Sequence, residues 1–120
     1  MTRQISFSKY GKKVLPSFRN KINQAESTED LKKFFVYTIK DLFDDIFTDQ
    51  VDLYYEDIEL NPSAAPNYRL SERLLASKVF AASWRDSDLP KIVGDLAATA
   101  VKRYIHLEKN TAKSEAKIRM

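Results

Sequence analysis

Residues 31–47, LKKFFVYTIKDLFDDIF, place apolar side chains three and four positions apart along the chain. This spacing puts those side chains on one face of a helix with 3.6 residues per turn. Ser27 precedes the stretch as a candidate N-cap, and Glu29 and Asp30 suit the positive end of a helix dipole. The stretch therefore predicts an amphipathic α-helix that begins near Thr28 and buries one face.

An acidic stretch of eight carboxylates and no base, DLFDDIFTDQVDLYYEDIE, occupies residues 41–59. If the helix continues at 100° per residue, six of these carboxylates fall within a sector of about 80°. We call these six the acidic row: Asp41, Asp45, Asp49, Asp52, Glu56 and Glu59. We adopt the interpretation that one helix, or two nearly collinear helices, runs on to Glu59. The alternation of apolar residues over 51–55 and the low helix propensity of Asp indicate instead a break near Thr48.

Three other segments also have helical periods. Apolar residues follow Pro16 at helical spacing, a mostly apolar segment over 72–84 follows a candidate cap at Ser71, and a fourth stripe begins at Leu89. Two glycines in 120 residues, with no Asn-Gly or Asp-Gly pair, argue against a β-sandwich or barrel. We predict an all-α helical bundle of about four main helices, with antiparallel neighbours joined by short loops.

The length of 120 residues corresponds to one domain, which we expect to span residues 1–108. The basic N-terminal segment of this domain is its least defined part. Residues 109–120 lack an apolar stripe and are expected to form a frayed, disordered basic tail. The chain has no cysteine, no apolar run near the roughly 18 residues of a membrane span, and no signal-peptide pattern. We therefore expect a cytoplasmic protein without a membrane partner.

No catalytic, nucleotide or metal motif stands out in the sequence. His106 is the only histidine, and position 103 is arginine where a carboxylate-bridged metal site in a bundle would place glutamate. Two distant glycines cannot build a phosphate-binding loop or a calcium loop. The sequence therefore predicts no enzyme, no cofactor and no metal site.

Charge is strongly segregated along the chain. Residues 1–40 hold nine bases and three acids, residues 41–60 hold eight acids, and residues 61–120 hold eleven bases and six acids. Segregated charge steers partners of opposite charge, and tyrosine is enriched in protein interfaces. Four tyrosines are candidates for such an interface: Tyr37, Tyr54, Tyr55 and Tyr68. We predict a helical protein that binds a protein partner, or a second copy of itself as a homodimer, through the acidic row.

The basic ends of the chain leave a second hypothesis open. Lys12 and Lys13 near the start, with Lys102 and Arg103 near the end, are candidates for contacts with phosphates. The protein would then be a regulator that binds nucleic acid. Against this hypothesis stands the acidic row, which would repel a phosphate backbone wherever the two came close.

Overall fold

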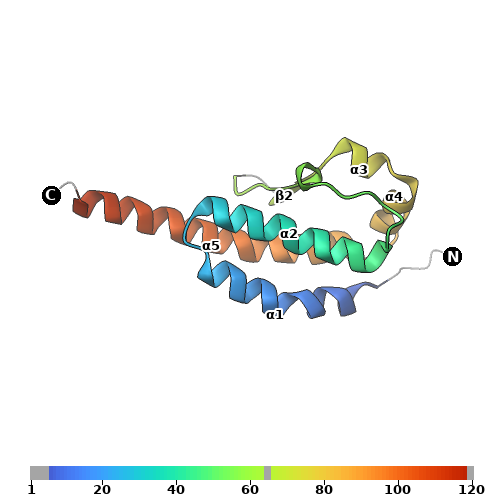
Figure 1. Ribbon diagram of the computed structural model, residues 1–120, viewed down its shortest axis with the longest axis horizontal. Helices are drawn as coiled ribbons and strands as arrows, with labels where there is room; N and C mark the ends of the chain where they lie inside the picture. Colours follow the sequence, from blue (N-terminus) through green and yellow to red (C-terminus); the bar gives the residue numbers. More distant parts are fainter. Residues whose placement is uncertain (1–5, 64–65, 119–120) are drawn as a thin grey trace.

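The computed structural model describes residues 6–63 and 66–118, with side chains up to residue 109. Helices α1 (Ser8–Gln24), α2 (Thr28–Phe47) and α5 (Leu89–Ile118) pack against one another with their axes along the long direction of the molecule, and α5 extends beyond the other two (Figure 1). The chain between α2 and α5 forms η1 (Tyr55–Asp57), β1 (Ile58–Leu60), β2 (Tyr68–Leu70), α3 (Glu72–Ala76) and α4 (Lys78–Arg85). The predicted all-α bundle is confirmed as a mostly helical bundle, with a small antiparallel pair of strands that the sequence did not predict.

Helix α2 is the centre of the bundle, and its predicted apolar face is buried. Phe35, Ile39 and Phe43 are fully buried on α2, and α1 adds the fully buried Phe18. Burying one such side chain contributes roughly 1.5–3 kcal/mol. The predicted cap is also present, because the Ser27 hydroxyl accepts a hydrogen bond from the Asp30 amide at 3.1 Å. The periodic stretch therefore determines both where α2 begins and which face it buries.

Helix α1 begins at Ser8, earlier than the Pro16 start that the sequence indicated, and Pro16 lies inside it. A proline inside a helix removes one backbone hydrogen bond. Contacts from the other end of the chain hold both ends of α1. The Asp88 carboxylate accepts from the Phe7 amide at 2.7 Å, and Arg103 donates to the carbonyl of Ile22 at 3.1 Å.

Each of these two hydrogen bonds, which we call the anchors of α1, joins residues 81 positions apart in the sequence. The equal separation means that α1 and α5 are parallel and keep the same register along their length. Gly11 lies between the anchors, where an added Cβ would come within 2.8 Å of Ile92. The missing side chain lets α1 approach α5 closely at this point. Helix α2, in contrast, runs antiparallel to both of its neighbours (Figure 1).

The chain leaves the helix at Phe47, so the adopted prediction of helix to Glu59 is wrong and the alternative break near Thr48 is correct. Thr48 and Asp49 both have positive φ, at 41° and 64°. The last turn of α2 carries carboxylates and no base, which is unfavourable at the negative end of a helix dipole. The following residues reach η1 and β1, which contact α2.

The predicted helix over 72–84 is divided at Ser77 into α3 and α4. Ser77 has extended geometry, and its hydroxyl accepts from the Phe80 amide at 3.4 Å, so it caps α4. Serine favours caps because its hydroxyl competes for backbone groups. Phe80 is fully buried on α4, with its ring 5.1 Å from that of Phe43. The predicted cap at Ser71 is confirmed, with a 3.1 Å bond from the Leu74 amide.

Helix α5 begins at Leu89 as predicted and continues to Ile118, where a frayed tail was expected. Residues 109–118 contain Lys, Ala and Glu without Gly or Pro, and such residues favour helix even when no stripe is buried. The domain boundary at residue 108 stays a prediction. Within the ranges that the structure describes, none of the helices combines the length and apolar character needed to cross a bilayer.

Candidate functional site

The acidic row does not form one helix face. Asp41 and Asp45 are exposed on α2, whereas Asp49, Asp52 and Glu56 lie on the chain that follows it and Glu59 lies on β1. The geometric premise for the row is therefore wrong, because the helix that would align the six carboxylates ends at Phe47. All six side chains are exposed, and whether they bind a partner stays a prediction.

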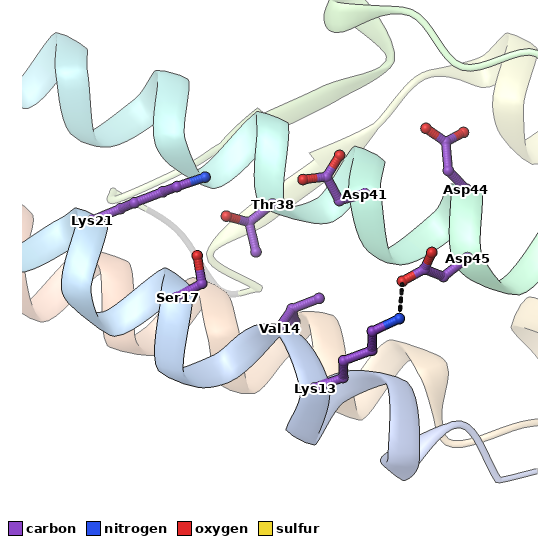
Figure 2. Close-up of a pocket in the computed structure, with 8 residues that line it drawn as sticks. All are labelled: Lys13, Val14, Ser17, Lys21, Thr38, Asp41, Asp44 and Asp45. Carbon is purple, nitrogen blue, oxygen red and sulfur yellow. Dashed lines mark ion pairs between the residues drawn. The ribbon is translucent and has the colours of Figure 1, made fainter.

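Two carboxylates of the row face the molecule's own basic helix. A cavity of about 320 Å³ lies between α1 and α2 (Figure 2). It is lined by Lys13, Val14, Ser17 and Lys21 from α1 and by Thr38, Asp41, Asp44 and Asp45 from α2. The Lys13 Nζ lies 3.6 Å from the Asp45 carboxylate, while Figure 2 shows Asp44 pointing away from α1. Lys13 and Asp45 thus pair within the chain, and exposed pairs of this kind contribute roughly 0–1 kcal/mol.

This cavity combines opposite charges without a recognisable reactive group. Lys13 and Lys21 come from one wall, and the carboxylates come from the other. In the part of the chain that the structure describes, no three His, Asp or Glu side chains are placed to share a metal ion. The Lys13–Asp45 pair adds to the contact between α1 and α2, and the lining gives no support for chemistry at this position.

Two exposed tyrosines from different elements meet beside the acidic residues. The ring of Tyr37 on α2 lies 5.7 Å from that of Tyr55 in η1, edge to face, and the two residues are 42% and 43% exposed. Asp41 and Asp44 lie one and two turns further along α2 on nearly the same side as Tyr37. Glu56 follows Tyr55 and is exposed. We call these five residues the tyrosine–carboxylate surface.

The other two nominated tyrosines have structural contacts. Tyr68 is half-buried against Trp84, with 6.0 Å between ring centroids, and burial raises the pKa of its phenol. Tyr54 is exposed, but the Arg73 guanidinium lies 4.7 Å from its ring centroid. Tyr68 therefore belongs to the packing of the hairpin on α4 and α5.

Asp57, for which the sequence indicated no specific role, is the buried carboxylate of the acidic stretch, at 4% exposure. Its oxygens accept hydrogen bonds from the Ser71 hydroxyl at 2.6 Å, from the Tyr54 amide at 2.9 Å and from the Arg73 guanidinium. Arg73 also donates to the carbonyl of Asp52 at 2.5 Å. These contacts fasten the segment after α2 to the start of α3.

Burial alone would raise the pKa of Asp57, because it penalises the charged carboxylate. The hydrogen bonds from Arg73, Ser71 and Tyr54 favour the charged form and outweigh this effect, so the pKa lies below its ordinary value. The same pairing raises the pKa of Arg73. A low pKa in a closed network marks Asp57 as a structural group.

The four nominated bases separate into two sites. Lys12, Lys102 and Arg103 line the groove between α1 and α5, joined there by Arg19, whereas Lys13 faces α2. Arg103 is partly buried and also donates to the carbonyls of Ile22 and Asn23 at 3.1 Å, which caps the end of α1. Arg19 is not one of the four nominated bases, and its neighbours on α5 lie about 80 positions away in the sequence.

Comparison with known proteins gives no relative for this chain: no protein family, curated protein or solved structure matches it.

Proposed function

We propose that the protein acts by binding another protein through the tyrosine–carboxylate surface. The observation that carries the proposal is the Tyr37–Tyr55 pair, which keeps two aromatic rings in contact and more than two-fifths exposed. Tyrosine supplies a large contact area with few rotatable bonds, and it is enriched among residues that dominate binding energy. Hydration of the surface alone does not explain why two elements hold an exposed aromatic pair in contact.

The charges around the pair indicate the kind of partner. Asp41 and Asp44 on α2 and Glu56 in η1 supply three exposed carboxylates, while Lys33 lies 6.0 Å from the ring of Tyr37 and Lys40 lies one turn along α2 from it. The carboxylates outnumber these two lysines by three to two, so the partner surface should be basic. A second copy of this chain is one source of such a surface, because α1 carries five bases and no acid.

Light scattering at low and high salt separates self-association from binding to a different protein. A dimer that dissociates as salt rises would identify the second copy as the partner. A monomer at both salts directs the search to a different protein, by affinity capture from cell lysate followed by titration with the purified partner. In either case we expect the contact to weaken at high salt, because charge is screened.

The decisive variant is Tyr37→Ser with Tyr55→Ser, which removes the aromatic pair and leaves every charge in place. We expect at least about tenfold weaker binding to the purified partner or second copy, as for a pair of central interface residues. The matched control is Val79→Ser with Ile105→Ser, which removes two similarly exposed apolar side chains on α4 and α5. Equal binding by both double variants would refute the proposed surface.

A further inference from the structure

A continuous groove runs along α1 and α5 and collects basic side chains from both helices. One cavity of about 320 Å³ is lined by Lys12 and Arg19, and a second of about 410 Å³ is lined by Arg19, Lys102 and Arg103. The two cavities share Arg19 and Thr99, so they are consecutive parts of one groove. The parallel register of the helices places these bases along one groove, although those on α1 are far in sequence from those on α5.

The groove is strongly biased towards positive charge. Helix α1 contains no acid, and among the residues that line the groove only Asp95 is a carboxylate. Lys12, Arg19 and Lys102 are exposed, whereas Arg103 is held on the end of α1. Three long basic side chains at the surface can thus reach a ligand without breaking contacts that support the fold.

The acidic row lies away from this groove. None of its six carboxylates lines either cavity, and Asp41 and Asp45 line the separate cavity between α1 and α2. No carboxylate of the acidic row would therefore contact a phosphate backbone that lies in the groove. A polyanion lying along α1 and α5 would meet mainly basic side chains.

The lining of the groove also indicates which polyanion fits. Neither cavity is lined by Phe, Tyr or Trp, and His106 supplies the one imidazole on which an unpaired base could stack. Leu15, Ile92 and Leu96 line the first cavity, but the second is polar apart from the buried Ile22. An acidic amphipathic helix would need an apolar floor along its whole length. These features favour contact with phosphates alone.

We infer that the α1–α5 groove binds the phosphate backbone of double-stranded nucleic acid, without reading its sequence, through Lys12, Arg19 and Lys102. Arg103 adds positive charge from its fixed position at the end of α1. This site does not depend on the tyrosine–carboxylate surface. Four cations that each displace a counterion predict a slope of about −3.6 for log affinity against log salt concentration.

The test is fluorescence anisotropy with labelled DNA and RNA duplexes of about 20 base pairs, titrated at several salt concentrations. We expect the wild-type protein to bind duplexes of unrelated sequence equally, and comparison of DNA with RNA identifies the preferred backbone. Arg19→Glu with Lys102→Glu should weaken binding at least tenfold and reduce the salt slope to about half. Circular dichroism checks that the variant retains its helices.

The control is Lys33→Glu with Lys78→Glu, which makes the same change in net charge at exposed positions outside the groove. This control should keep most of the wild-type affinity. Equal loss in both double variants, or no duplex binding by the wild type, would overturn the inference. Polyglutamate that competes as well as unlabelled duplex at equal charge would also overturn it, and would assign the groove to an acidic protein.

Discussion

The two halves of the acidic stretch have similar composition and different structures. Residues 41–47 are helical, whereas residues 48–59 form a left-handed turn, an extended segment, η1 and the start of β1. The first half places Leu42, Phe43 and Phe47 in the core. The second half is attached by Asp57, whose carboxylate bonds to Ser71 and Arg73. The difference shows that the spacing of carboxylates alone does not specify a helix. The packing of the residues between the carboxylates determines whether the segment is helical.

The largest expected loss of stability comes from truncating Phe43 in the helical half. Phe43 is fully buried, and its ring contacts those of Phe80 and Trp84. Phe43→Ala should lower the free energy of unfolding by about 3–5 kcal/mol, because it leaves a cavity in the core. Urea unfolding followed by the fluorescence of Trp84, the single tryptophan, measures this loss.

The matched change in the second half is Tyr55→Ala, which truncates a partly exposed ring. Its cost should stay within about 1 kcal/mol. Equal losses of unfolding free energy in Phe43→Ala and Tyr55→Ala would mean that the two halves are stabilised in the same way.

An intermediate effect is expected at Asp57. Asp57→Asn removes the buried charge that Arg73 and Ser71 contact, and it should cost about 2–3 kcal/mol. Arg73 is half-exposed and can regain water, which keeps the loss below that of a fully buried pair. Asp52→Asn, at an exposed position on the same segment, should change stability by less than about 0.5 kcal/mol.

The same variant should change how stability depends on pH. The pKa of Asp57 is lower in the folded protein than its unfolded value of about 3.9, so its contribution is complete above that value. That contribution is lost as the pH falls from there through the folded pKa. Asp57→Asn should therefore flatten the acid side of the stability curve, and an unchanged curve would contradict the role of the network.

The smallest expected change in stability is at Thr48, where the helical half meets the second half. Thr48 is β-branched and has a φ of 41°, a conformation that glycine adopts at lower cost. Thr48→Gly should raise the free energy of unfolding by about 1 kcal/mol. Gln50→Gly, nearby at a position without positive φ, should lower it instead. A loss of stability at Thr48 would show that the turn is not strained.

The helices and their caps could be predicted because their signals are local. The spacing of Leu31, Phe35 and Ile39 predicted the buried face of α2, and Ser27 and Ser71 predicted two helix starts. The segment after Phe47 could not be predicted in the same way. Its carboxylates fit a helical period by chance, and its principal contact joins Asp57 to a residue 16 positions later.

The candidate sites were only partly predictable for the same reason. Tyr37 and Tyr55 were nominated one by one, but their contact depends on η1 folding back beside α2. Lys12 and Lys102 were also nominated, but Arg19 joined them only when the register of α1 against α5 was known. Sequence identifies the kinds of side chain, and the packing of distant elements determines which of them meet.

The anchors at the two ends of α1 also have a consequence for the order of folding. Phe7 bonds to Asp88 and Ile22 bonds to Arg103, each across 81 residues. Contacts over such separations carry a high loop-closure cost and form slowly. During synthesis, α1 and α2 can pair as a local hairpin as soon as both exist. The ends of α1 are fastened only after α5 has been made, so α1 is synthesised before α2 and α5 but completed only after both.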